Sequence, residues 1–166
     1  MKSLLVLVLM LSLAATAEAR GRRSRNYSSA PCGPCAAAEI AKGMPPAIKA
    51  EVEKVDLNKV EEQLLAETNA ARVRNGRKPL VIDRHLQRCA RWHTIWMCRN
   101  RTMTHGSGVA ENIAMGQNSA YEVVQVAWMN SSGHQANMLN SGHTKVGLAA
   151  YCTPNGTIYW CQQFSR

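Results

Sequence analysis

Three side chains in the second half of the chain have the types that metal binding or acid–base chemistry requires. His105 stands in Met-Thr-His-Gly-Ser-Gly, Glu111 opens Glu-Asn-Ile-Ala-Met-Gly, and His134 follows Trp-Met-Asn-Ser-Ser-Gly. Two imidazoles and a carboxylate can hold a divalent metal with one position open, or move protons to and from a bound molecule. His105 and His134 are therefore candidate ligands of zinc or another divalent metal, and Glu111 is the accompanying carboxylate.

Helices and strands that position these residues follow from periodicity and capping signals. Apolar residues at helical spacing predict helices at 58–75 and 83–100, with Asp83 as the N-cap of the second. Shorter helices are expected at 47–55, from Ser119 onward, and at 134–139. Strands are expected at 146–152 and 158–164, with 108–114 as the best candidate for one more. Helices before, between and beside a small antiparallel sheet predict an α/β fold, a three-layer α-β-α sandwich.

The order of the motifs resembles the CAP superfamily, also called the SCP domain, which includes cysteine-rich secretory proteins, antigen 5 and pathogenesis-related proteins. Residues 133–140, Gly-His-Gln-Ala-Asn-Met-Leu-Asn, resemble its compact bacterial branch. Residues 64–72 resemble the opening helix of the domain, and the whole resemblance covers 57–165. It implies the same α-β-α sandwich, with a surface cleft that carries two His and two Glu and that binds a divalent metal in some members. By motif, the resemblance places His105, Glu111 and His134 together in this cleft.

One acid of that family site has no counterpart in this chain. In the larger members the second Glu lies just after the Trp of the third helix, but Trp128 is followed here by Met-Asn-Ser. Glu122 precedes the Trp, and we interpret it as part of a capping box with Ser119. A missing carboxylate removes one general base and weakens the case for hydrolysis. Asn112 and Asn137 are expected to support the cleft through their side-chain amides.

The other histidines fall outside the matched positions. His93 shares the apolar face of its helix and is interpreted as a packing residue, and His85 at the helix start is expected to be exposed. His143 is expected in the connection before Val146, from which it can still approach the cleft as an extra ligand. Serine catalysis is excluded because no Gly-x-Ser-x-Gly motif is present.

Composition and charge indicate how the chain is divided into segments. Residues 1–19 have the charge pattern and apolar stretch of a signal peptide, which predicts secretion. Residues 20–56 form a basic, cysteine-containing arm, and 57–166 the CAP domain. The net charge is +9, but four of the arginines crowd the start of the arm, which indicates a basic tail and not a nucleic-acid groove. After residue 19 no stretch is apolar enough to span a membrane.

Six cysteines in an exported chain predict disulfides. Cys152 and Cys161 flank Thr-Pro-Asn-Gly-Thr, and a two-residue turn at Gly156-Thr157 would set them opposite each other. This pair also resembles the C-terminal hairpin bridge of CAP proteins. Cys89 and Cys98 lie about 13 Å apart along one helix and cannot bridge each other. They pair with Cys32 and Cys35, or else Cys32-Gly-Pro-Cys35 closes on itself. A redox role for that motif is disfavoured because no strand precedes it.

These observations favour a secreted binding module over an enzyme. The ligand would be an extracellular lipid, glycan or protein, as the CAP resemblance implies, and a monomer that requires no cofactor is expected. The alternative is a zinc-dependent hydrolase of peptide or cell-wall polymer. In that hypothesis His105 and His134 hold Zn²⁺ and Glu111 takes the proton of the attacking water.

Overall fold

The computed structural model describes residues 30–31, 44–54 and 56–166. The predicted signal peptide and most of the arm, with Cys32 and Cys35, lie outside the described residues. A four-stranded sheet runs through the middle of the domain in the order β2-β5-β6-β4. Its strands are β2 (Val81–Ile82), β4 (Ala110–Met115), β5 (Lys145–Cys152) and β6 (Ile158–Ser165). The three longer strands confirm those predicted from the sequence.

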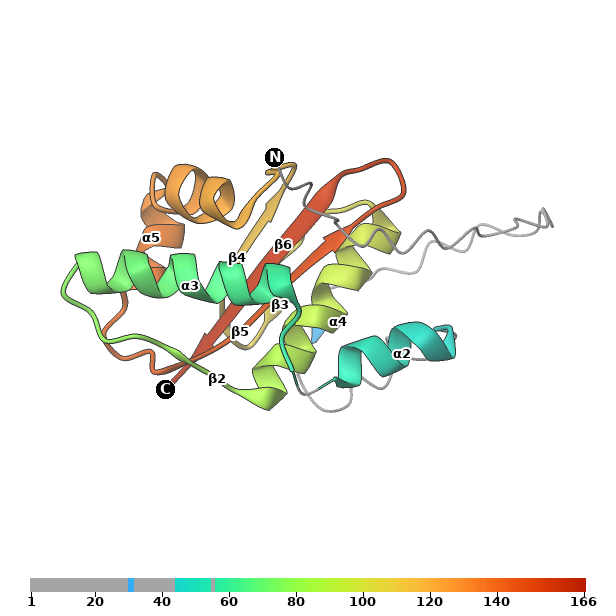
Figure 1. Cartoon of the computed structure of the whole chain (residues 1–166), viewed down its shortest axis with the longest axis horizontal. Coiled ribbons are helices and arrows are strands. Elements are labelled where there is room, and N and C mark those ends of the chain that lie inside the picture. The colour runs from blue at the N-terminus through green and yellow to red at the C-terminus, as the bar shows by residue number, and fades with distance from the viewer. Residues whose placement is uncertain (1–29, 32–43, 55) are drawn as a thin grey trace, which may run out of the picture.

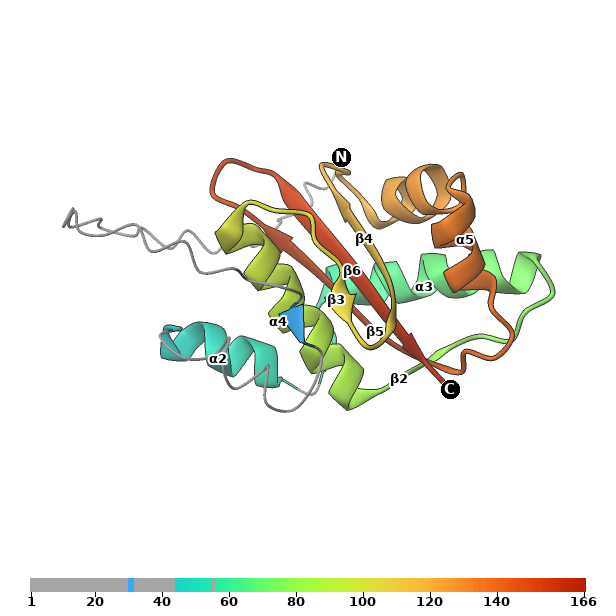
Figure 2. The same cartoon turned by 180° about the vertical axis from the view of Figure 1, so that it is seen from behind.

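Helices cover both faces of this sheet and make three layers (Figures 1 and 2). One face carries α3 (Lys59–Arg74), the π-helix η1 (Glu122–Trp128) and α5 (Ser132–Leu139). The other face carries α4 (Arg84–Asn100), and the short α2 (Pro46–Glu53) packs against α4. The architecture is therefore the predicted three-layer α-β-α sandwich.

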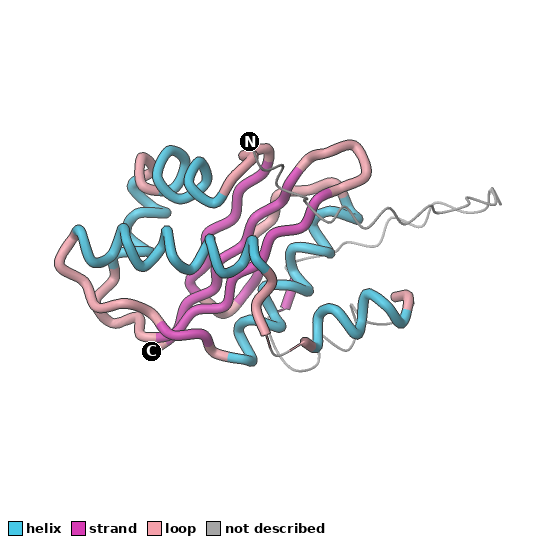
Figure 3. The backbone as a smooth tube through the Cα atoms, viewed as in Figure 1, coloured by secondary structure: helices cyan, strands magenta, loops and turns pink. Residues whose placement is uncertain are grey.

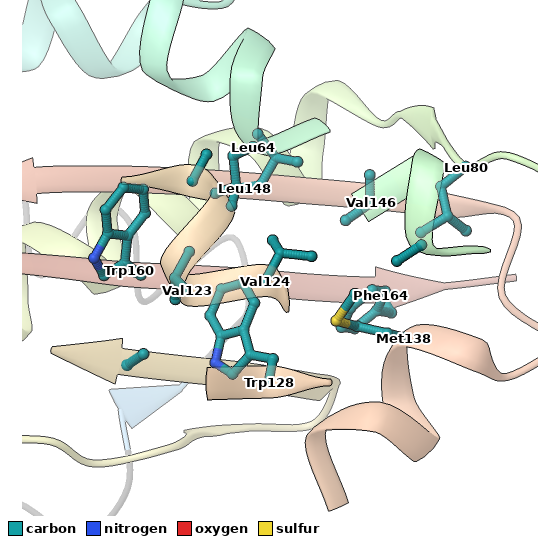
Figure 4. Packing of buried hydrophobic residues seen from close by; sticks show 13 residues of the cluster. Leu64, Leu80, Val123, Val124, Trp128, Met138, Val146, Leu148, Trp160 and Phe164 are labelled. Carbon is teal, nitrogen blue, oxygen red and sulfur yellow. The ribbon is translucent and has the colours of Figure 1, made fainter. Parts of the chain in front are cut away.

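The larger hydrophobic core lies between the sheet and α3, η1 and α5. Alternate residues of β5 and β6 point to this side, because successive side chains of a strand face opposite ways. Its largest fully buried side chains are Trp128 and Trp160, and Figure 4 shows Trp160 at one end of the cluster. The buried members are Leu64, Ala71, Leu80, Ala114, Ala120, Val123, Val124, Trp128, Met138, Val146, Leu148, Trp160 and Phe164.

The opposite face of the sheet packs against α4 at very short range. A Cβ atom at Gly147 of β5 would lie 2.0 Å from the carbonyl carbon of Leu86 in α4. Only glycine allows this approach. Ala149 and Cys161 then pack against Ala90 and other residues of α4 in a second core. The helix consequently rests on the backbone of the strand.

The two long helices begin at capping residues, of which the sequence had indicated Asp83. Asn58 and Glu61 form a reciprocal capping box at the start of α3, and Asp83 accepts from the backbone N–H of His85 and Leu86 at the start of α4. Glu61 has a second role, because the guanidinium of Arg91 binds both of its oxygens at 2.6 and 2.8 Å. This buried bidentate pair ties α3 to α4.

Two features of the sheet differ from the sequence prediction. The sheet is mixed, because β2 runs parallel to β5 while the other pairs are antiparallel. A separate parallel pair joins β1 (Ala30–Pro31) to β3 (Gly106–Ser107). Figure 3 distinguishes the strands from the helices and loops along the backbone. In the described part of the chain, no helix has the length and hydropathy of a membrane span.

The predicted opposition of Cys152 and Cys161 is wrong. The register pairs Cys152 with Ile158 and Cys161 with Ala149. The connection is a five-residue loop, 153–157, in which Thr153 donates to and accepts from the loop backbone and Gly156 has φ 85°. This longer loop shifts the register. The two cysteines thus lie on opposite faces of the hairpin, and neither is in a disulfide.

Candidate functional site

Glu111 is the buried centre of the polar residues around strand β4. Its side chain is only 1% exposed, on the face of β4 that is turned toward α4. Oε2 accepts the backbone N–H of Gly106 at 2.8 Å, and Nδ1 of His105 lies 3.1 Å from the same oxygen and donates to it. Because the carboxylate fixes one ring nitrogen, His105 presents its Nε2 atom outward.

The second oxygen of Glu111 is equally occupied. Oε1 accepts from Nε2 of Gln163 at 2.9 Å and from the thiol of Cys161 at 3.5 Å, and Nε2 of His93 lies 3.5 Å away. Burial beside Glu111 raises the pKa of Cys161 well above the ordinary value for a thiol, so Cys161 stays protonated as a donor. A carboxylate with this many donors has little capacity left to take a proton from water.

The loop that carries His105 is anchored to helix α4. The helix ends at Asn100, and its C-cap residue Arg101 adopts a left-handed conformation with φ 50°. His93 lies seven residues before the end of α4, and its Nε2 donates to the carbonyl oxygen of Thr104 at 2.9 Å. The residue directly before His105 is therefore fixed, while the His105 side chain itself is 58% exposed.

His134 reaches the site from the other side of β4. It lies in the first turn of α5, half-buried, with its ring centroid 6.5 Å from that of the buried Trp128. Burial lowers the pKa of His134, and the charge of His105 lowers it further. His134 is therefore close enough to His105 to sense its charge, and its imidazole is kept neutral.

A network of side-chain amides holds α5 against β4. Nδ2 of Asn112 donates to the backbone carbonyl of His134 at 3.1 Å, and Nδ2 of Asn137 donates to Oδ1 of Asn112 at 3.0 Å. Asn137 also donates to the carbonyl of Glu111 at 3.1 Å. The Asn112 side chain, which takes part in two of these bonds, is completely buried. The network fixes the first turn of α5 and with it His134.

Arg72 fixes the segment that follows α5. Its buried guanidinium donates to the carbonyl oxygens of Lys78, Met138, Asn140 and His143. Desolvation lowers its pKa, and the neighbouring Arg77 lowers it further. The His143 ring stacks on Phe164 with centroids 5.3 Å apart, and its Nδ1 donates to the carbonyl of Asn137. His143 therefore has a packing position next to α5.

The polar residues thus lie on both sides of β4, which is the end strand of the four-stranded sheet. Successive residues Glu111 and Asn112 face opposite ways, so one supports His105 and the other supports His134. One observation links the two imidazoles, namely that His105 contributes to the lowered pKa of His134. Glu122 is not part of this group, because its carboxylate accepts from the backbone N–H of Asn118 at the start of the η1 segment.

Three partners of Glu111 were missed or under-interpreted from the sequence. Gln163 and Cys161 received no role near Glu111, and His93 was interpreted only as a packing residue, although it is buried and faces the carboxylate. A period-two pattern in 158–164 was the one available signal. It places Cys161 and Gln163 on the same strand face, but only the pairing of β6 with β4 brings that face to Glu111.

The arrangement does not form a closed metal site. Within the described residues, no group of three or more His, Cys, Asp or Glu side chains is placed to hold a metal ion. The oxygens of Glu111 accept from four donors, so His105 and His134 remain as two imidazole ligands. A catalytic zinc centre ordinarily has three protein ligands. Zinc binding by His105 and His134 therefore stays a prediction, and it would rest on two imidazole ligands.

The protein is an α/β sandwich with a buried Glu and two His around an end strand of its sheet. Comparison with known proteins gives the family of this fold. Residues 65–164 match the model of the CAP domain, the cysteine-rich secretory protein family. The chain belongs to the CAP superfamily.

Several similar proteins are bacterial. The chain is 38% identical over 122 residues to the uncharacterized protein YkwD of Bacillus subtilis, a match that covers 63% of this chain and 46% of YkwD. The chain therefore spans about half the length of that relative. Among solved structures, an outer surface protein of Borrelia burgdorferi is 24% identical with a TM-score of 0.61, covering 68% of this chain and 96% of that protein. An extracellular SCP-domain protein of Bacillus anthracis is 23% identical with a TM-score of 0.53, covering 74% and 44%. At these identities the two structures support the fold.

Proposed function

We propose that this protein is a secreted CAP-domain binding module whose extracellular ligand contacts His105 and His134. The occupancy of the Glu111 carboxylate is the observation that carries this proposal. Each oxygen already accepts from at least two donors, and the side chain is 1% exposed. Glu111 therefore acts as a fixed support for His105, and a general base for hydrolysis is lacking at this position.

His105 and His134 remain to contact the ligand, and they differ in exposure and in orientation. His105 is exposed and oriented through Nδ1, so its Nε2 faces solvent. His134 is half-buried and neutral, which gives it one donor and one acceptor nitrogen. Such a pair suits a ligand with hydroxyl, amide or carboxyl groups, as glycans, peptides and lipid headgroups have. A divalent cation would find two nitrogen ligands here, which makes a weak site.

Imidazole resonances in an NMR titration test this proposal directly. The probes are oleate, a chitooligosaccharide, soluble peptidoglycan fragments and ZnCl₂, each added to the mature oxidised protein. We expect one organic probe to shift His105 and His134 together and saturably, and we expect His134→Ala to abolish the shift. His85→Ala is the control, because His85 lies exposed at the start of α4.

Two results would contradict the binding proposal. If no organic probe shifts either imidazole, the histidines do not face a ligand of these classes. If ZnCl₂ binds at micromolar concentration or tighter and the metal-loaded protein cleaves peptidoglycan, with loss of cleavage in Glu111→Gln, the hydrolase alternative is correct instead.

A further inference from the structure

The connection from the end of helix α3 to strand β2 carries positive charge without any acid. Between Glu67 and Asp83 the sequence contains four basic residues and no Asp or Glu. Arg72 is the buried one, and the exposed ones are Arg74, Arg77 and Lys78. Across the described residues, none of the three exposed side chains forms an ion pair with a carboxylate. We call residues 73–81 the basic tip.

The basic tip lies at one end of the molecule. Figure 1 shows the connection between α3 and β2 at the left end of the long axis, with α2 at the opposite end. Residues 73–79 are all exposed, and so is Val81. Because the tip projects along the long axis, it can reach a flat surface ahead of the rest of the domain.

Two valines of the basic tip expose more than half of their surface. Val73 is 57% exposed and Val81 is 62% exposed. Val73 lies in the last turn of α3, one turn after Asn69 on the same face of the helix. The side-chain amide of Asn69 binds both backbone groups of Leu80, the residue before Val81, at 2.8 and 3.0 Å. The two valines therefore flank the charged chain reversal, one at each of its ends.

Side-chain hydrogen bonds hold the backbone of the basic tip. Nε of Arg72 donates to the carbonyl oxygen of Lys78 at 2.8 Å. Asn75 is the C-cap of α3, and its Nδ2 donates to the carbonyl oxygen of Ala71 at 2.8 Å. Gly76 then reverses the chain with φ 69°. The charged and apolar side chains thus stand on a fixed backbone, which lowers the entropy cost of binding a partner.

Positive charges crowd around the base of the basic tip. Burial lowers the pKa of Arg72 first and Arg77 lowers it next, so the two guanidinium groups lie close to each other. Exposed Lys145 pairs directly with Val81 in the sheet and adds another cation. Asp83, the next acid along the sequence, accepts from backbone N–H groups at the start of α4. A negatively charged partner would offset this excess of positive charge.

We propose that the basic tip docks this protein onto a membrane surface that contains anionic lipid. The cations attract the headgroups, and Val73 and Val81 enter the boundary between headgroups and acyl chains. The two exposed valines favour a lipid surface over an anionic polysaccharide, which would need the charges alone. Residues 73–81 include no aromatic side chain on which a nucleic-acid base could stack. The basic tip shares no residue with the candidate site, so this proposal does not rest on a ligand at His105 and His134.

Cosedimentation with lipid vesicles tests the docking. The mature protein is mixed, in about 0.1 M NaCl, with vesicles of phosphatidylcholine and phosphatidylglycerol in equal parts or of phosphatidylcholine alone. We expect binding to the anionic vesicles only. Replacing both tip cations, Arg77→Gln with Lys78→Gln, should weaken this binding roughly 10- to 30-fold. Replacing both valines, Val73→Ser with Val81→Ser, should weaken it roughly fivefold, because their burial in the lipid boundary is partial.

Matched controls separate docking by the basic tip from attraction by net charge. Lys59→Gln with Arg99→Gln removes the same charge from exposed positions on other elements, and Val126→Ser changes a valine that is 56% exposed on η1. Both controls should bind anionic vesicles almost as the wild type does, and so should His134→Ala. Amide hydrogen exchange gives an independent readout, since residues 73–79 should exchange more slowly when anionic vesicles are present.

Four results would overturn the proposal. The first is no binding to anionic vesicles. The second is an equal loss of binding in the Lys59 and Arg99 control, which would mean that net charge, including the arginines of the arm, drives the attraction. The third is binding to heparin that is as tight as binding to vesicles and is unchanged by the valine substitutions, which would assign the basic tip to an anionic polymer. The fourth is loss of vesicle binding in His134→Ala, which would place the lipid at the candidate site.

Discussion

The two histidines of the site are held in opposite ways. His105 is 58% exposed, and a side-chain bond to the buried Glu111 orients its ring. His134 is half-buried, and it is positioned through its backbone, because Asn112 holds the first turn of α5. The first depends on one carboxylate, whereas the second depends on the docking of a whole helix. From this difference we can predict which substitutions should affect one imidazole and not the other.

The largest effect is expected from Glu111→Ala. It leaves Gly106, Gln163 and His105 without their acceptor in a buried place, so we expect a loss of about 2–4 kcal/mol in the free energy of unfolding. Urea unfolding measures this, with Glu122→Ala as a control at a partly exposed acid. A loss no larger than that of the control would show that Glu111 is not the hub of the site.

A smaller effect is expected from Asn112→Ala, which removes the bond to the backbone of His134. We expect about 1–3 kcal/mol of destabilisation and a shifted His134 resonance, while the His105 resonance stays in place. The matched control is Asn130→Ala, an exposed asparagine at the end of η1. Equal shifts of both imidazoles would contradict the independent anchoring of the two histidines.

The pH dependence of stability separates the imidazoles further. The pKa of His134 is lower in the folded protein than its ordinary value near 6.5, so the unfolded chain takes up this proton more readily. Stability from His134 is complete above that value and is lost as pH falls below it toward the folded-state pKa. We expect Tm to decline less between pH 7 and pH 5 in His134→Gln than in the wild type. An identical decline would mean that His134 is not desolvated.

The smallest effect on stability is expected from His105→Ala. The side chain is mostly exposed, and Glu111 retains its other donors, so we expect a change within about 1 kcal/mol by urea unfolding. Ligand-induced shifts at His134 should nevertheless weaken. Strong destabilisation in this variant would show that His105 is a structural residue and not a ligand contact.

Short-range patterns predicted most of the fold. The capping residue Asp83 and the helical or alternating spacing of apolar residues predicted helices and strands close to those observed. The partners of Glu111 could not be found this way, because Gln163 is 52 residues away and only strand pairing brings it near. The cysteine hairpin was misjudged for a related reason: Asn155-Gly156 indicates a turn, but the bonds of Thr153 decide the length of its loop.

The contact between Gly147 and Leu86 makes the site vulnerable to a change far from it. A single methyl group at position 147 would have to separate two layers whose backbones touch. The lifted helix would carry His93 with it, and through Thr104 it would pull on the loop of His105. A substitution at Gly147 would therefore look, in a screen for lost ligand recognition, like a mutation of the recognition surface itself. The absence of a side chain at Gly147 therefore determines how closely α4 packs on the sheet, and through α4 where the loop of His105 is held.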